Sequence, residues 1–236
     1  MTICKKAELE FCERMWSTDQ NVYKERLQSI GFCNLDRVLD LGAGCGQWSL
    51  ALSELNNYVD SVEPSEVKIE FFTRRIKNKK NIFIYKRKAE KFDFKNQYYD
   101  GIFCYGAIHY MPINILKKLY LSLKKGGVVY ISAINLEFYI YTIIHGHNDS
   151  INFDSRKNAI EVIKNAIMNS YWPDKKRYPT IYLSNYLVDV MKKVGFSIIE
   201  VNNEGKINIT GRNIKSFYPE DRFGKMSVYE ILAAKR

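Results

Sequence analysis

Three glycines alternate with other residues in the segment VLDLGAGCGQW, residues 38–48, at positions 42, 44 and 46. A glycine-rich turn between a strand and a helix lets the main chain approach a ligand, and free N–H groups at the helix start face that ligand. A dinucleotide-binding turn would have its third glycine at position 47, where this chain has Gln47. Asp40, shortly before the first glycine, would lie poorly beside a pyrophosphate. Its carboxylate suits a ligand that carries a cationic amine.

A second carboxylate stands at the end of the next apolar run. Glu63 follows residues 58–62, which we expect to form a strand. In a doubly wound sheet the tip of that strand lies beside the glycine loop, at the crevice where ligands bind. A carboxylate there can accept hydrogen bonds from both hydroxyls of a ribose. Asp40 and Glu63 together therefore indicate a ligand with a nucleoside at one end, an ammonium group nearby and no phosphates.

From residue 37 to residue 134 the chain resembles the class I S-adenosylmethionine-dependent methyltransferases, and a weaker resemblance continues after residue 184. In these enzymes the glycine loop approaches the methionine portion of the cofactor, and the acid after the second strand holds the ribose. The expected cofactor is S-adenosylmethionine, with S-adenosylhomocysteine as its product. The resemblance assigns cofactor contacts in this part of the chain to Asp40, Gly42, Ala43, Gly44, Glu63 and Pro64.

Two further motifs carry the resemblance. The segment KAEKFDF, residues 88–94, is similar to the family motif after the third strand, although Lys88 stands where the family often has an acid. The segment YDGIFCYGAIHYMP, residues 99–112, resembles the fourth-strand motif. The resemblance implies that Ala89 and Glu90 contact the adenine, and that Cys104, Tyr105 and Gly106 lie beside the sulfonium.

The three histidines of the chain are the candidates for a general base. Methyl transfer from a sulfonium is an in-line displacement, so the protein mainly aligns the reactants and removes water. A hydroxyl acceptor must also lose its proton, which a histidine can assist, whereas a carboxylate acceptor needs no base. His109 follows the fourth expected strand, and His145 and His147 lie in a segment expected near the same crevice. We expect one of them to act as the base; a metal site that includes Asp149 is the alternative, and we expect no metal.

The apolar pattern predicts an α/β fold with a doubly wound, mostly parallel, seven-stranded sheet, because expected strands alternate with expected helices. The expected strands are 37–41, 58–62, 82–85, 99–104, 128–133, 196–201 and 227–233. Helices are expected before Gly31, around Trp48–Leu55, after an N-cap at Ser65, around Leu116–Leu123 with a stop at Gly126-Gly127, around Ile160–Ile167, and from an N-cap at Ser184 to Gly195.

We expect one domain over residues 1–236, since no linker or internal repeat divides the chain. Within it, residues 1–30 are expected to form a helical cap. The regular alternation is interrupted at residues 135–183. We interpret this segment as an insert after the fifth strand that binds the substrate.

Length and composition indicate a globular protein. The chain has 236 residues, of which 46% are hydrophobic and 26% are charged, and this excludes a disordered, collagen-like or coiled-coil protein. The net charge of +10 makes a polyanionic partner worth considering. The five cysteines are odd in number and form no CxxC pair. We therefore expect neither a disulfide framework nor a zinc site, and a cytoplasmic location. We also expect no signal peptide and no membrane span, because polar residues interrupt the most apolar stretch.

Absent motifs narrow the choice of acceptor. Residues 99–112 contain no Asn/Asp-Pro-Pro-Tyr/Phe tetrad, which argues against amino-methylating DNA enzymes, and the chain has no Pro-Cys pair of the kind that methylates cytosine. Residues 135–183 are rich in aromatic and amide side chains that suit a sugar. With GQW at residues 46–48, they resemble saccharide O-methyltransferases of surface-polysaccharide pathways. We expect O-methylation, or carboxylate methylation, of a small molecule such as a sugar or nucleotide-sugar.

Two other functions stay open. An RNA methyltransferase would gather basic residues on one face, and basic clusters occur at residues 74–80, 86–88 and 175–177. We favour the small-molecule enzyme because these clusters are spread over several expected elements and no RNA-binding module is recognisable. The third possibility is a non-catalytic protein that binds the cofactor with the same fold.

Overall fold

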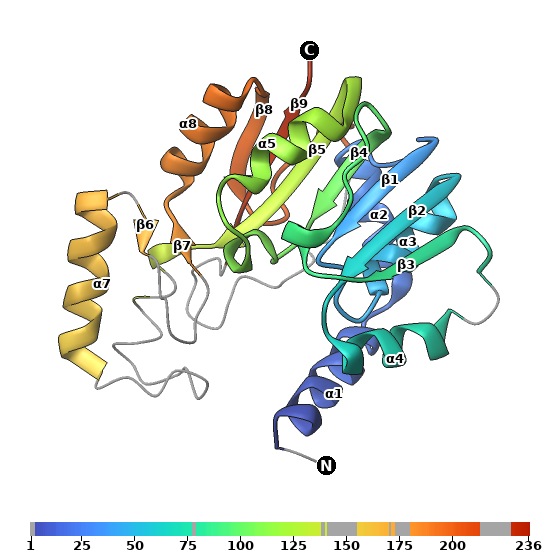
Figure 1. Ribbon diagram of the computed structural model, residues 1–236, viewed down its shortest axis with the longest axis horizontal. Coiled ribbons are helices and arrows are strands. Elements are labelled where there is room, and N and C mark those ends of the chain that lie inside the picture. The colour runs from blue at the N-terminus through green and yellow to red at the C-terminus, as the bar shows by residue number, and fades with distance from the viewer. Residues whose placement is uncertain are drawn as a thin grey trace.

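The computed structural model describes residues 3–76, 79–137, 140, 155–169, 171–172, 180–212 and 228–236. Its centre is a seven-stranded sheet in the order β3-β2-β1-β4-β5-β9-β8 (Figure 1). The strands are β1 (Arg37–Leu41), β2 (Tyr58–Glu63), β3 (Ile82–Lys86), β4 (Tyr99–Cys104), β5 (Leu123–Ile134), β8 (Ser197–Asn203) and β9 (Val228–Ala234). The first five pair in parallel, and β9 runs antiparallel between β5 and β8. The doubly wound sheet predicted from the sequence is confirmed.

The strand order reverses between β1 and β4. At such a switch point the loops after the two strands leave towards opposite faces, which opens a crevice outside the carboxyl ends of the strands. The helices around the sheet are α1 (Ile3–Trp16), α2 (Gln20–Ser29), α3 (Gln47–Leu55), α4 (Glu66–Arg75), α5 (Ile115–Ser122), α7 (Ser155–Asn169) and α8 (Ser184–Val194). Two single turns, η1 (Ala89–Lys91) and η2 (Ile108–Tyr110), follow β3 and β4, and a short pair of strands, β6 (Tyr171–Trp172) and β7 (Ile181–Tyr182), precedes α8.

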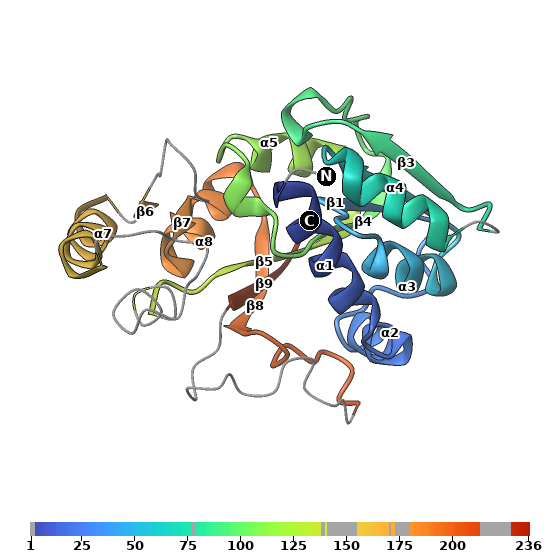
Figure 2. The ribbon, with the colours of Figure 1, turned by 90° about the horizontal axis from the view of Figure 1, so that it is seen from below.

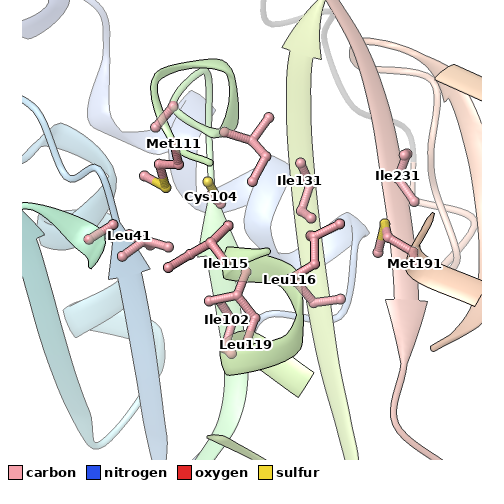
Figure 3. Close-up of a cluster of buried hydrophobic side chains, with 14 of the residues drawn as sticks. Leu41, Ile102, Cys104, Met111, Ile115, Leu116, Leu119, Ile131, Met191 and Ile231 are labelled. Carbon is pink, nitrogen blue, oxygen red and sulfur yellow. The ribbon is translucent and has the colours of Figure 1, made fainter. Parts of the chain in front are cut away.

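Both faces of the sheet are covered by apolar helix faces. On one face α5 and α8 pack on β4, β5 and β9, and Figure 3 shows Leu116, Leu119 and Met191 from the helices among Ile102, Ile131 and Ile231 from the strands. On the other face α2 and α3 bury Tyr23, Leu27, Trp48 and Leu52. Each fully buried side chain of this size stabilises the fold by about 1.5–3 kcal/mol.

The helix α1 lies at the carboxyl-end edge of the sheet, beside α4 (Figures 1 and 2). Cys12 of α1 and Cys45 of the glycine loop form a disulfide, with their Cα atoms 5.4 Å apart. The expectation that the cysteines are unpaired is therefore wrong for these two. They are 33 residues apart in the sequence, and only the packing of α1 over the loop brings them together. Cys33 and Cys104 are free.

Two predicted helix boundaries differ from the structure. The helix α5 ends at Ser122, before Gly126-Gly127, and both glycines lie inside β5. Gly126 has φ +81°, and the register between β4 and β5 shifts between Tyr99 and Gly101, so the glycines serve an irregularity of the strand and not a helix cap.

At the other boundary, Ser184 is the first residue of α8, and no side chain caps this helix. The cap at Ser65 is confirmed, since Lys68 N–H donates to its Oγ over 3.4 Å. The stop at Gly195 is confirmed too: it has φ +118° and follows the last residue of α8. Among the residues that the structure describes, no helix is long and apolar enough to cross a membrane.

Candidate functional site

A cavity of about 540 Å³ opens at the carboxyl ends of β1, β2 and β4, where the switch point of the sheet predicts a ligand site. The glycine loop after β1, the ends of β2 and β3, the loop after β4 and the helix α1 enclose it. Its volume falls in the range of small-molecule sites, about 300–1,000 Å³. Nine of the eleven predicted cofactor residues line it: Gly42, Ala43, Gly44, Glu63, Pro64, Ala89, Glu90, Tyr105 and Gly106.

The glycine loop needs glycine for reasons of space. Gly42 has φ +83°, and a Cβ there would come within 2.3 Å of the Cβ of Ala107. Gly46 has φ +81°, and its Cβ would meet the ring of Phe72 at 1.9 Å. The N–H groups of Gly42 and Ala43 both donate to the carbonyl of Val62, over 2.8 and 3.0 Å. The loop is thus held against the end of β2 while it borders the cavity.

The carboxylate of Glu63 holds this loop with hydrogen bonds. Its Oε2 accepts a hydrogen bond from the N–H of Gly44 over 2.9 Å, and its Oε1 accepts one from the N–H of Ser65 over 2.8 Å. Each carboxylate oxygen can accept more than one hydrogen bond. Glu63 can therefore hold the loop and still accept hydroxyl groups of a ligand.

Two of the predicted cofactor residues, Cys104 and Asp40, are buried and do not line the cavity. Asp40 is 2% exposed, and its carboxylate accepts a hydrogen bond from the hydroxyl of Ser49 over 2.6 Å. Burial, with a smaller contribution from the charge of Glu63, raises the pKa of Asp40 to about 7. In this structure Asp40 supports the start of α3 from beneath the loop.

The helix α1, part of the predicted cap, contributes to the site, whereas the sequence did not single out Gln47. Phe11 and Met15 of α1 line the cavity, and the indole N–H of Trp16 donates to the carbonyl of Cys45 over 2.7 Å. Gln47 also lines the cavity and is 6% exposed, and its Oε1 has no hydrogen-bond partner among the described residues. The one sequence signal for Gln47 is its place directly after the third glycine, at the start of α3.

Aromatic rings form the opposite side of the cavity. Tyr105 lines it directly after β4, and its ring lies 4.9 Å from that of Trp48 and parallel to that of Phe103. The hydroxyl of Tyr105 donates a hydrogen bond to the carboxylate of Glu204. Glu204 is buried and lies directly after β8. Sequence reasoning missed Glu204 because it is a single acid in a polar connection, without a motif around it.

His109 lies in η2, behind this aromatic side. It is buried, does not line the cavity itself, and its neighbours Tyr110 and Met111 do. Its Nδ1 has no hydrogen-bond partner among the described residues, and burial lowers its pKa to about 4. His145 and His147 lie outside the described residues. Within the part of the chain that is described, no three His, Cys, Asp or Glu side chains are grouped to hold a metal.

The comparisons with known proteins agree with this arrangement. Residues 38–127 match the family model of a methyltransferase domain. A protein of Listeria monocytogenes, described as an S-adenosylmethionine-dependent methyltransferase, is 19% identical, with a TM-score of 0.64 over 90% of this chain and 95% of that one. An S-adenosylmethionine-dependent methyltransferase of Mesorhizobium loti is 17% identical, with a TM-score of 0.62 and the same coverage.

A third solved structure is a phosphoethanolamine N-methyltransferase of Haemonchus contortus with S-adenosylhomocysteine. It is 20% identical, with a TM-score of 0.57 over 78% of this chain and 38% of that longer one. The search among curated proteins finds no match for the sequence. The matched domain and the shared fold agree with the resemblance of the chain to class I S-adenosylmethionine-dependent methyltransferases, whose cofactor is S-adenosylmethionine.

Proposed function

We propose that the protein transfers a methyl group from S-adenosylmethionine to a hydroxyl or carboxylate oxygen of a small molecule, with saccharides and nucleotide-sugars as the first class to test. The observation that carries this proposal is that Phe11 and Met15 of α1 line the cavity. A cavity of about 540 Å³ that a helix helps to line suits a cofactor and a compact acceptor better than a polymer.

Two features of the pocket fit the cofactor. The loop at Gly42 and Gly46 approaches so closely to other parts of the chain that side chains are excluded there. Gln47 lines the cavity, and its buried amide oxygen has no hydrogen-bond partner among the described residues; an ammonium group of a ligand would supply the missing donor. When bound, S-adenosylmethionine supplies the methyl group on a good leaving group.

The individual roles follow the family resemblance. Glu63 with Pro64 would hold the ribose, and Ala89 and Glu90 would flank the adenine. Tyr105 and Gly106 would lie beside the sulfonium. The loop residues Gly42, Ala43 and Gly44 would meet the methionine portion, and Asp40 would act on its amine through the loop that it supports.

A histidine would take the acceptor proton. Burial keeps His109 neutral but also makes it a weak base, because it lowers the pKa to about 4. Its Nδ1 has no hydrogen-bond partner among the described residues, and the next residue, Tyr110, lines the cavity. His145 and His147 are the other candidates. We further propose that residues 1–30 form the cap of a single domain and that residues 135–183 surround the acceptor.

Cysteine and RNA chemistry receive less support. Burial raises the pKa of the Cys104 thiol far above its ordinary value, so this thiol is a poor nucleophile. An RNA-binding surface needs basic side chains that are not already paired. In the basic clusters at residues 74–80 and 86–88, three side chains form ion pairs with acids: Arg75 with Glu13, Lys79 with Glu54, and Lys86 with Glu66.

The decisive experiment is mass spectrometry of cofactor turnover with nucleotide-sugars, polyols, carboxylic acids and mixed RNA as acceptors. We expect S-adenosylhomocysteine together with an O-methylated small molecule. Methylated RNA would make the protein an RNA enzyme, and no turnover with any acceptor would favour a binding protein. Replacing His109, His145 or His147 by Ala should leave cofactor binding intact, and at least one replacement should abolish transfer.

Glu63→Ala tests the cofactor site independently of the acceptor. The substitution removes charge-assisted hydrogen bonds to the loop and to the ribose, so we expect cofactor affinity to fall by about 2 kcal/mol. Calorimetric titration with S-adenosylhomocysteine measures this change. Unchanged affinity would remove Glu63 from the site.

A further inference from the structure

We propose that Glu204 is a positioning residue that acts through Tyr105 and makes the pocket prefer the positively charged sulfonium donor over the neutral thioether product. The proposal rests on the proposed function, which places the sulfonium beside Tyr105. Glu204 comes directly after β8, 99 residues from Tyr105 in the sequence. The fold alone brings this acid to the cofactor pocket.

The contact between the two residues is direct and closed to water. Glu204 is 2% exposed, and the Tyr105 hydroxyl donates to its Oε1. Its Oε2 is buried and has no hydrogen-bond partner among the described residues. The main chain fixes the position, since the N–H of Glu204 donates to the carbonyl of Val228 over 3.2 Å. A buried carboxyl group with one oxygen unpaired costs stability, which favours a role in binding.

Tyr105 connects Glu204 to the pocket. Its ring packs against Trp48, at 4.9 Å, and lies parallel to Phe103, at 6.2 Å. One end of the phenol thus meets the buried acid while the residue lines the cavity. An electron-rich aromatic ring attracts a nearby cation, and a negative group at its hydroxyl strengthens this attraction.

The charges around Glu204 leave it without a cation of its own. Four ionisable groups face it: Tyr105, Arg26 of α2, Tyr130 of β5 and Glu230 of β9. Arg26 forms a buried ion pair with Glu230, which also accepts hydrogen bonds from the Tyr130 hydroxyl and from the N–H of Ile207. The single positive charge of Arg26 therefore faces two acids, Glu230 and Glu204. When Glu204 ionises, the cluster has a surplus negative charge that a cationic ligand complements.

This arrangement couples donor binding to the proton on Glu204. Burial and the charge of Glu230 raise the pKa of Glu204 to about 8, against the opposing effects of Tyr105 and Arg26. Glu204 is then mostly protonated in the free protein at neutral pH. A cation bound nearby favours the ionised form, so donor affinity should rise as the pH passes through this pKa, by the linkage of binding and proton release. The neutral product gains nothing from the same ionisation.

The test is calorimetric titration of the full chain with S-adenosylmethionine and with S-adenosylhomocysteine, at about pH 6.5 and about pH 9. Glu204→Gln keeps the size of the side chain and its hydrogen bond to Tyr105. At the higher pH we expect it to weaken S-adenosylmethionine binding about 10-fold, and S-adenosylhomocysteine binding less than about 2-fold. The titration of the ligand's own amine is common to both proteins and cancels in the comparison.

Two controls keep the proposal falsifiable. Tyr105→Phe removes the connecting hydroxyl but keeps the ring; it should reproduce the effect of Glu204→Gln, and the double variant should add nothing. Glu63→Ala should weaken both ligands alike. Equal losses for both ligands in Glu204→Gln, or no loss at all, would overturn the role of Glu204. Failure of the unmodified protein to bind either ligand would instead overturn the proposed cofactor site.

Discussion

The pocket has two sides that are built differently. The glycine side, residues 42–48 with Glu63, takes its shape from the main chain, because backbone N–H groups meet the Glu63 carboxylate and the end of β2. The aromatic side, residues 105–111 with Glu204, is built from side chains. Two of its buried ionisable groups, His109 and Glu204, each have a polar atom without a partner among the described residues.

The electrostatic consequences also differ. Burial lowers the pKa of His109 to about 4 and raises that of Glu204 to about 8, so both groups are kept neutral. A ligand that brings charge changes their ionisation, whereas the backbone contacts of the glycine side do not titrate. The glycine side should therefore determine whether a nucleoside fits, and the aromatic side should determine which charge state of the ligand is preferred.

The largest expected effect is on the shape of the glycine side. Gly46 and Gly126 share φ +81°, but a Cβ at Gly46 would meet Phe72 at 1.9 Å, whereas nothing lies within 4 Å of one at Gly126. Gly126→Ala should cost about 1 kcal/mol for the left-handed backbone. Gly46→Ala should cost about 3 kcal/mol more, since the buried ring of Phe72 must move. Urea unfolding measures both, and equal losses would show that the loop tolerates a side chain.

The glycine side could be predicted from the sequence because its determinants are local. The turn at Gly42 and Gly46 needs positive φ in a short segment, and Glu63 stands at a strand end that topology places next to it. The same holds for most strands, which follow from apolar runs. The helix α5 was extended too far because Gly126-Gly127 resembles a helix stop, whereas Leu123 already begins β5.

The aromatic side and the cap depend on contacts between distant segments. Glu204 reaches Tyr105 across 99 residues, and Cys12 reaches Cys45 across 33. No pattern along the chain marks either pair, because each partner is ordinary in its own segment. From the sequence, Gln47 was noted only because a dinucleotide-binding turn would have a glycine at this position. Only the cavity, which other loops complete, shows that the buried oxygen of Gln47 belongs to a ligand site.

The disulfide gives the next largest effect, and it tests whether α1 belongs to the glycine side. Cys12→Ser should lower the free energy of unfolding by about 3 kcal/mol without reductant, because the bond closes a loop of 33 residues. With reductant, the variant and the unmodified protein should unfold at the same urea concentration. Cys33→Ser is the matched control, since Cys33 is free and partly exposed, and it should change little. An unmodified protein that is insensitive to reductant would contradict the bond.

The smallest effect concerns the aromatic side and depends on pH. The pKa of His109 falls from the ordinary 6.5 to about 4 on folding, so the unfolded chain takes up a proton between these values and the folded protein does not. The free energy of unfolding is therefore unaffected by His109 above about pH 6.5, and it decreases as the pH falls below this value. We expect the loss between pH 7 and pH 5 to be about 2 kcal/mol larger for the unmodified protein than for His109→Gln.

Urea unfolding of both proteins across this pH range measures the difference. Asp40 and Glu204, whose pKa values are raised, act with the opposite sign, because the stability they provide is lost as the pH rises. Both acids are present in the two proteins, so their effects cancel in the comparison. Parallel pH profiles would mean that His109 is solvated when folded, and the aromatic side would then lose one of its two buried groups with an unpartnered polar atom.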